Sequence, residues 1–150
     1  MIAVASDHAG LELKKEIIKE LELLGMSYRD YGCFDDSSCH YPEYAFKAAQ
    51  AVVSGECDRG LLFCGTGVGV SIAANKVPGA RCACCSDVYS ASMARGHNNA
   101  NLLALGGRVL GAGAALAIVR TFLETPFDLS NPRHKERLDM IHTFERRKLE

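Results

Sequence analysis

Short apolar runs alternate with amphipathic segments from one end of the chain to the other. Apolar runs at 2–6, 26–31, 59–64, 81–85 and 102–105 each fit a strand, and helical patterns fill the intervals. In the first interval Leu13, Ile17 and Leu21 recur at helical spacing, with charged residues such as Lys14 and Glu20 between them. Strands that alternate with helices favour a parallel sheet, because right-handed crossovers place helices on its faces.

The same patterns predict the remaining helices and the fold class. Beyond the helix at 11–24, we expect helices over 43–53, 71–76, 87–95, 111–123 and 133–147. The chain has 150 residues, enough for one domain with a core of its own. We therefore expect an α/β fold, a Rossmann-like three-layer α/β/α sandwich with a five-stranded parallel sheet, as a single domain over residues 1–150.

Charge and composition narrow the range of partners. Lys and Arg number 17 against 18 Asp and Glu, a net charge of -1, so no overall basic field would attract nucleic acid or an anionic membrane. The first residues lack an export signal, and no run of about 18 apolar residues occurs, which predicts a cytoplasmic protein with no membrane partner.

Seven cysteines form an odd set in a chain without an export signal, so we expect free thiols. Three of them, Cys82, Cys84 and Cys85, lie in an apolar run that predicts a buried strand, where successive side chains point to opposite faces. The sequence therefore predicts no metal site and no cofactor there.

The stretch from Cys64 to Ser71 follows the third predicted strand and precedes a helix. Ligands of parallel sheets bind beyond the carboxyl ends of strands, and backbone N–H groups at a helix start attract anions, so this stretch fits an oxyanion cradle. Two alternatives stay open: a glycine-rich turn needed only for tight packing, and a dinucleotide site. The dinucleotide fingerprint is partial, since Val70 stands at its third glycine position, although Asp87 occupies a suitable acidic position.

Other polar groups are expected near this edge of the sheet. Cys64 ends a strand beside a helix N-terminus, where a thiolate able to act as nucleophile or base is favoured; the alternative is a small buried side chain. Thr66 could pass a proton, and Asp7 and His8 follow the first strand, where a helix-capping role is the alternative for Asp7. A further group is the polar run from His97 to Asn101, which turn propensity also explains. Another is the pair Arg133 and Arg137, which lie on one face of the last predicted helix; the alternative is an exposed basic face with no binding role.

At Ser6–Gly10, Cys64–Lys76 and His97–Asn101 the chain closely resembles the type B ribose-5-phosphate isomerases, nearly end to end. That family includes galactose- and allose-6-phosphate isomerases. The resemblance implies that Cys64 moves a proton between C1 and C2 of an open-chain sugar phosphate through an enediolate held by backbone N–H groups of residues 65–71. It also implies that Thr66 assists the proton transfer and that Asp7 and His97 open the furanose ring.

The same resemblance implies a phosphate site formed by His8, Arg133 and Arg137. The residues expected to contact substrate are His8, Tyr41, Gly65, Gly67, Val68, Gly69, Ser71, Asn98, Arg108, Arg133 and Arg137. It further implies a homodimer or homotetramer with shared active sites, in which the His97 loop or the arginines cross the interface and the helix at 133–147 packs on a neighbouring subunit.

Two departures from the family pattern leave details open. Asn131-Pro132 precedes Arg133 where two glycines are frequent, and His40 stands where an aspartate is common. The choice between five- and six-carbon sugar phosphates, and between dimer and tetramer, is open at this stage. A non-catalytic sugar-phosphate or nucleotide binding module and a thiol redox protein are the competing functions.

Overall fold

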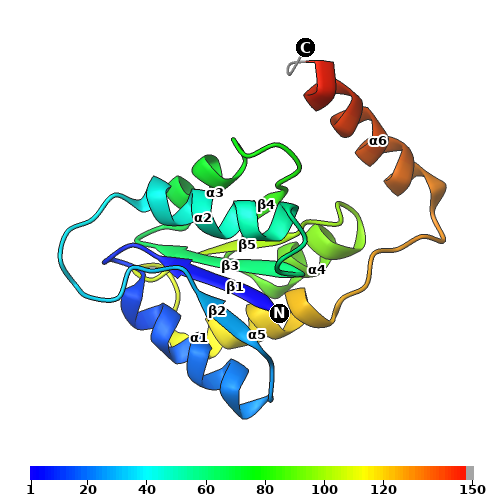
Figure 1. The fold of residues 1–150 in the computed structure, drawn as a ribbon. Helices are drawn as coiled ribbons and strands as arrows, with labels where there is room; N and C mark the ends of the chain where they lie inside the picture. The colour runs from blue at the N-terminus through cyan, green and yellow to red at the C-terminus, as the bar shows by residue number, and fades with distance from the viewer. Residues whose placement is uncertain (148–150) are drawn as a thin grey trace.

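The computed structural model describes residues 1–147 and contains a five-stranded, all-parallel sheet in the order β2-β1-β3-β5-β4 (Figure 1). The strands are β1 (Ile2–Ser6), β2 (Tyr28–Asp30), β3 (Arg59–Cys64), β4 (Cys82–Cys84) and β5 (Leu102–Gly106). The helices are α1 (Leu11–Leu23), α2 (Tyr41–Val53), α3 (Val68–Ala74), α4 (Val88–Gly96), α5 (Ala112–Glu124) and α6 (Pro132–Arg147). The expected α/β fold with a five-stranded parallel sheet is confirmed.

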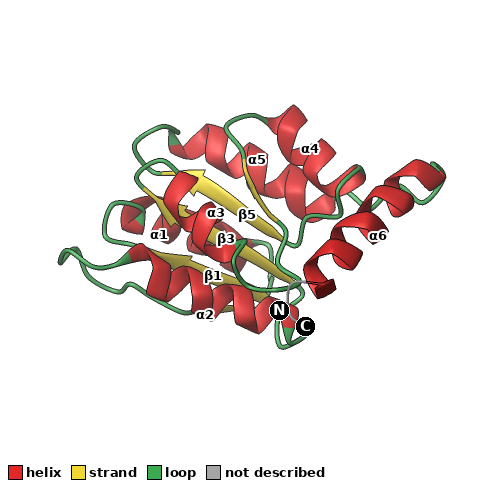
Figure 2. Cartoon of the chain, turned by 90° about the horizontal axis from the view of Figure 1, so that it is seen from above, coloured by secondary structure: helices red, strands yellow, loops and turns green. Residues whose placement is uncertain are grey.

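Helices cover both faces of the sheet (Figure 2). One core joins the sheet to α1, α4 and α5 and is built of large side chains such as Phe63, Leu105, Ile17 and Phe122. The other joins the sheet to α2 and α3 and is dominated by alanines, among them Ala5, Ala48 and Ala73. Successive strand residues point to opposite faces, which is how Phe63 enters the first core and Cys64 the second.

Several local predictions need correction. The strand expected at 81–85 is the short edge strand β4, and Cys84 is exposed because no further strand covers that edge within residues 1–147. The strand expected at 26–31 is reduced to β2 at the opposite edge, and α3 begins at Val68 instead of Ser71. Lys14 and Glu20 are buried, although the helical pattern placed them among the polar positions, because Asp30 and Arg120 pair with them.

Helix α6 lies beyond the amino ends of the strands, on the side from which the strands start in Figure 1. The carboxylate of Glu145 accepts a hydrogen bond from the Gly79 N–H at 2.9 Å, and Arg81 contacts the His142 ring at 3.2 Å. His134 and Leu138 are buried, whereas Met140 is 72% exposed. The helix is thus held at a few points and presents apolar surface outward.

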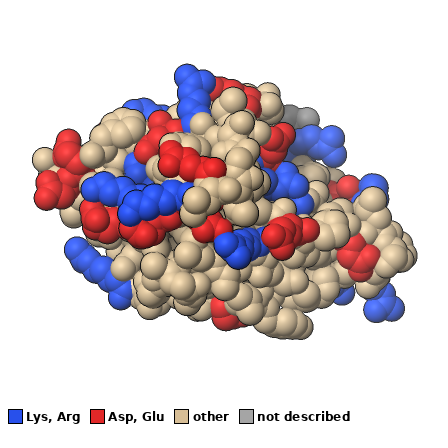
Figure 3. Space-filling model, turned by 90° about the horizontal axis from the view of Figure 1, so that it is seen from below, with Lys and Arg blue, Asp and Glu red and all other residues tan. Residues whose placement is uncertain are grey.

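The surface carries both signs of charge, in agreement with the nearly balanced composition. On the face seen in Figure 3, acidic and basic side chains are interspersed. Among residues 1–147, none of the helices is long and apolar enough to cross a membrane.

Candidate active site

The carboxyl ends of the three central strands are joined by backbone hydrogen bonds into one rigid edge. The Asp7 N–H donates to the Phe63 carbonyl at 3.1 Å, and the Gly107 N–H donates to the Cys64 carbonyl at 2.8 Å. The Arg108 N–H donates to the Gly65 carbonyl at 3.0 Å. Asp7, Cys64 and Arg108, which are far apart in the sequence, are therefore brought to the same edge.

The Cys64 side chain is the best-defined reactive group at this edge. The residue is 5% exposed, and its Sγ accepts a hydrogen bond from the Gly67 N–H at 3.1 Å. Gly67 has φ +80°, and a Cβ there would lie 2.9 Å from the carbonyl carbon of Leu105, so only glycine can present its N–H in this way. Such a hydrogen bond stabilises a thiolate more than a neutral thiol.

A second thiol, that of Cys84, lies near Cys64. Partial loss of hydration raises the pKa of the Cys84 thiol, and the proximity of Cys64 raises it further. The Cys84 Sγ faces the Thr66 carbonyl at 3.8 Å. The Cys84 thiol therefore stays protonated at neutral pH, which does not suit a general base.

The turn between β3 and α3 uses its side chains for internal bonds. The Thr66 Oγ1 accepts a hydrogen bond from the Val68 N–H at 3.3 Å, and the Ser71 Oγ donates to the Val68 carbonyl at 2.8 Å. Thr66 is exposed, whereas Ser71 is buried within α3. Of these two hydroxyls, only that of Thr66 lies where a ligand could reach it directly.

Asp7 and His8 each have a defined partner. The Asp7 Oδ1 accepts a hydrogen bond from the Gly10 N–H at 3.0 Å, which stabilises the turn before α1; the helix itself starts at Gly10 without a side-chain cap, so the helix-capping alternative for Asp7 is wrong. The His8 Nδ1 lies 3.3 Å from the backbone N–H of Cys39, which donates to it. Nothing in the sequence signalled that bond, because its donor is a backbone group in an irregular loop.

Tyr41 and Arg108 frame the same region. The Tyr41 ring packs over Gly69, where an added Cβ would lie 3.0 Å from the ring. A Cβ at Gly65 would lie 3.5 Å from the Arg108 Cδ, which places this arginine beside the turn. Both side chains are exposed, and both were among the predicted substrate contacts.

The other predicted residues form a separate group at the amino end of the sheet. His97 follows the last residue of α4, and its ring centroid lies 4.3 Å from that of the buried His134. Asn98, Arg133 and Arg137 are exposed around this pair. The contact between His97 and His134 ties the polar loop to α6, a link that the sequence did not reveal.

A carboxylate also belongs to this group. The pKa of Asp128 is lowered by hydrogen bonds from Ser130, with smaller contributions from the nearby His134 and His97 side chains. Its carboxylate lies 3.5 Å from the His134 Nδ1. Asn131 accepts a hydrogen bond from the Arg133 N–H at 3.2 Å, so Asn131-Pro132 forms the start of α6.

The two groups lie at opposite ends of the sheet in one chain. Helix α4 runs back from the carboxyl edge, and the loop after it pairs with Arg81 at the amino edge. Strand β5 then leads to Arg108, and its five residues span about 17 Å. Asp87, the possible ribose ligand, caps α4 through Ser90. A single chain therefore does not gather all the predicted residues into one site.

Comparison with known proteins gives consistent results. A family model described as ribose/galactose isomerase matches residues 2–141. Ribose-5-phosphate isomerase B of Escherichia coli is 44% identical over 147 residues, which cover 98% of this chain and 97% of that protein. The solved structure of Clostridium thermocellum ribose-5-phosphate isomerase B has a TM-score of 0.95 and 48% identity, covering 98% of each chain. That of the Mycoplasma genitalium protein with bound ribulose 5-phosphate has a TM-score of 0.90 and 40% identity, covering 97% of this chain and 95% of that chain.

Proposed function

The chain belongs to the ribose/galactose isomerase family, and from this premise we propose that it interconverts ribose 5-phosphate and ribulose 5-phosphate with Cys64 as the general base. The observation that carries the assignment of the base is the hydrogen bond from the Gly67 N–H to the Cys64 Sγ, at the end of the central strand. The Mycoplasma relative with ribulose 5-phosphate bound supports the choice of substrate.

The proposed chemistry is a proton transfer between neighbouring carbons. The Cys64 thiolate removes the proton from C2 of the open-chain aldose, and the electron pair forms the C1–C2 double bond of an enediolate with its charge on O1. A proton moves from O2 to O1 with the help of the Thr66 hydroxyl. The Cys64 thiol then returns its proton to C1, which yields the ketose and restores the thiolate.

Backbone groups of the turn and of α3 stabilise the enediolate in this proposal. The first N–H groups of a helix have no acceptor within the helix, and those of Val68 and Gly69 begin α3. The Val68 N–H donates to the Thr66 Oγ1 at 3.3 Å, so we assign the enediolate oxygen to the Gly69 N–H first. The Gly67 N–H is already engaged by Cys64, so it serves the base more than the substrate oxygen. This division refines the expectation that all N–H groups from residue 65 to 71 act alike.

Two copies of the chain are needed to assemble the site. We assign Asp7, His8 and Arg108 to one copy, and His97 with the α6 arginines to another. Support comes from their positions at opposite ends of the sheet, and from the exposure of His97, Arg133 and Arg137 in the single chain. Exposed apolar side chains such as Met140 and Ile141 on α6 offer a surface on which a second copy would pack.

Each copy then has a distinct task. Asp7 of one copy and His97 of the other open the furanose ring by moving the proton between the ring oxygen and the anomeric hydroxyl. The phosphate is bound by His8 and Arg108 on one side and by Arg133 and Arg137 on the other, with Tyr41 and Asn98 beside the sugar. A cytoplasmic location is part of the same proposal.

The test is the rate of ribulose 5-phosphate formation from ribose 5-phosphate in the presence of a chelator, for the wild type and for Cys64→Ala. We expect rapid turnover by the wild type, unchanged by the chelator, and its loss in the variant. Turnover of six-carbon aldose phosphates alone would overturn the substrate assignment. Loss of wild-type activity in the chelator would overturn the metal-free mechanism. Equal rates in the wild type and in Cys64→Ala would overturn the role of Cys64.

A further inference from the structure

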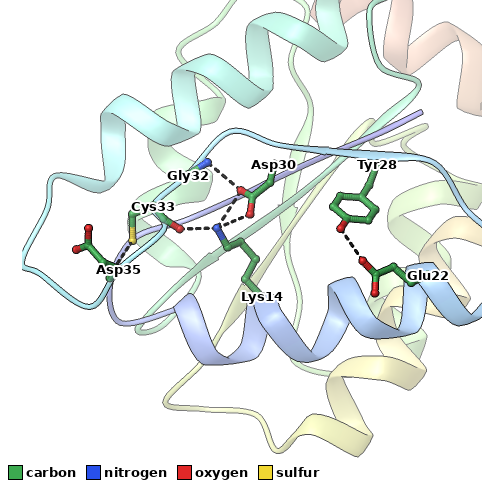
Figure 4. Close-up of polar contacts among 7 residues, drawn as sticks. All are labelled: Lys14, Glu22, Tyr28, Asp30, Gly32, Cys33 and Asp35. Atoms are coloured by element: carbon green, nitrogen blue, oxygen red, sulfur yellow. Dashed lines mark hydrogen bonds and ion pairs between the residues drawn. The ribbon is translucent and has the colours of Figure 1, made fainter.

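Lys14 is a fully buried cation in the middle of the first helix. The residue is 1% exposed, and its Nζ lies 2.9 and 2.8 Å from the two carboxylate oxygens of Asp30 (Figure 4). The Nζ also donates to the Cys33 carbonyl at 2.5 Å, and it lies 5.2 Å from the centre of the Phe34 ring. A buried charge is tolerated when it is paired and its hydrogen bonds are satisfied, and these contacts meet both conditions.

The contacts of Lys14 and Asp30 converge on one turn of the backbone. The Asp30 Oδ1 accepts a hydrogen bond from the Gly32 N–H at 2.9 Å, while Lys14 holds the next carbonyl, that of Cys33. The same turn is bonded to the end of β1: the Cys33 N–H donates to the Ser6 carbonyl at 2.6 Å, and the Ser6 N–H donates to the Gly32 carbonyl. The ion pair therefore anchors the start of the loop at 31–40 next to Asp7 and His8.

The far end of this loop bonds to His8. The backbone N–H of Cys39 lies 3.3 Å from the His8 Nδ1. A backbone amide can only donate, so the His8 Nδ1 must accept and cannot carry a proton. In the neutral ring the proton is then on Nε2, the nitrogen on the other side of the imidazole.

We propose that the Lys14–Asp30 pair is a positioning element that, through the loop at 31–40, holds His8 in the tautomer protonated on Nε2. The proposal rests on the assignment of His8 to the phosphate. In this form the Nε2–H can donate one hydrogen bond to a phosphate oxygen, while the ring stays neutral. The positive charge that balances the phosphate then comes from arginines such as Arg108.

The tautomer is measured without reference to turnover. In ¹⁵N-labelled protein at neutral pH, the two imidazole nitrogens give different chemical shifts according to which one carries the proton. The chain has 5 histidines, so the His8 signals are identified by their loss in His8→Gln. We expect an unprotonated Nδ1 and a protonated Nε2; the opposite assignment overturns the proposal.

The positioning role of the Lys14–Asp30 pair is tested by Lys14→Met, with Lys15→Met as the matched control. Lys15 is the next residue, and its ion pair with Glu12 is on the exposed side of the helix. We expect Lys14→Met to mix the tautomers and to raise the KM for ribose 5-phosphate about tenfold, the effect of losing one hydrogen bond to a charged group. The kcat should change less than about twofold, because the phosphate contact lies away from the reacting carbons.

A second variant covers the case in which Lys14→Met does not fold. The double variant Lys14→Met with Asp30→Asn removes both charges, so no unpaired buried charge remains, and the asparagine can still accept from the Gly32 N–H. Wild-type tautomer and KM in a folded anchor variant would overturn the positioning role. Equal changes in Lys15→Met would overturn the assignment to the buried pair.

The link from loop to ring is tested at Cys39. Cys39→Pro deletes the amide hydrogen, whereas Cys39→Ala deletes only the thiol, whose Sγ lies 3.8 Å from the His8 Nδ1. We expect the proline variant to change the His8 signals and the alanine variant to keep the wild-type tautomer. The reverse result would overturn the backbone mechanism.

Failure of this proposal and failure of the proposed function are distinguishable. If the wild type does not isomerise ribose 5-phosphate, the ¹⁵N signals still report the tautomer, and inorganic phosphate is used as the probe of His8 in the same spectra. A correct tautomer with no response of the Nε2 signal to phosphate would contradict the assignment of His8 to the phosphate site and leave the anchor itself supported.

Discussion

The two ends of the sheet carry polar groups of different character. At the carboxyl end, Asp7 and Cys64 are almost completely buried, and each accepts a hydrogen bond from a backbone N–H. At the amino end, His97 and the α6 arginines are exposed. Buried groups with fixed partners are suited to proton transfer, because they do not reorganise during the reaction. Exposed groups on a helix and a loop are suited to meeting a ligand on another molecule.

The largest effect is expected at the buried end. Cys64→Ala should lower kcat by about 10³-fold, within the usual range for loss of a general base. Steady-state rates with ribose 5-phosphate measure this change. The control is Cys84→Ala, because the raised pKa of Cys84 keeps its thiol protonated at neutral pH. A large loss in the control and none in Cys64→Ala would reverse the roles of the two thiols.

The second largest effect concerns the assignment of Cys64 and His97 to different copies of the chain. His97→Ala and Cys64→Ala should each be nearly inactive alone, because each lacks a residue of every site. Mixing the two after reversible unfolding should restore about a quarter of wild-type activity, because half of the dimers are mixed and each of those has one intact site. Activity that does not recover on mixing would place both residues in a site formed by one chain.

A smaller effect is expected for the phosphate contacts on α6. Arg137→Ala should raise KM about tenfold with little change in kcat, because a charged hydrogen bond is lost equally from the ground and transition states. Lys135→Ala is the matched control on the same helix, since Lys135 pairs with Asp139 on the exposed surface. If the two variants have equal KM values, Arg137 does not contact the phosphate.

The smallest effect is on stability at the amino end. The folded chain lowers the pKa of Asp128, so this carboxylate contributes stability above the unfolded pKa of about 3.9, and the contribution is lost as the pH falls through the folded value. Asp128→Asn should therefore lower the melting temperature slightly at pH 7 and approach the wild type in acid. Thermal unfolding across this range checks it, and a difference that persists unchanged in acid would contradict it.

Much of the fold could be predicted, because alternating strand and helix patterns specify a parallel sheet. The central strands β1, β3 and β5 lie close to their expected bounds, since continuous apolar runs reflect burial on both faces. The edge strands β2 and β4 are shorter than expected, because a strand with only one neighbour pairs along less of its length. Burial of Cys84 was wrongly expected for the same reason.

The site, like the fold, could be predicted only in part. The stretch from Cys64 to Ser71 is continuous in sequence, and its position at a strand end was predictable from general rules for parallel sheets. The burial of Lys14 was not, because it depends on Asp30, which belongs to another element of the fold. The His8–Cys39 bond was equally hidden, since no residue type encodes a backbone donor. The catalytic and binding roles themselves stay predictions.

The alanine-rich core between the sheet and α2 and α3 has a consequence for how the chain can change over evolution. A core of large side chains tolerates exchanges that conserve volume, because a methyl group lost from one side chain can be replaced by one added to a neighbouring side chain. In a core of alanines such as Ala48 and Ala73, neighbouring side chains are too small to compensate for an added group. Any larger side chain would therefore displace the helices from the sheet. Since α3 fixes the end of the turn whose Gly67 N–H bonds Cys64, substitutions should accumulate on the α1, α4 and α5 side before they are accepted between the sheet and α3.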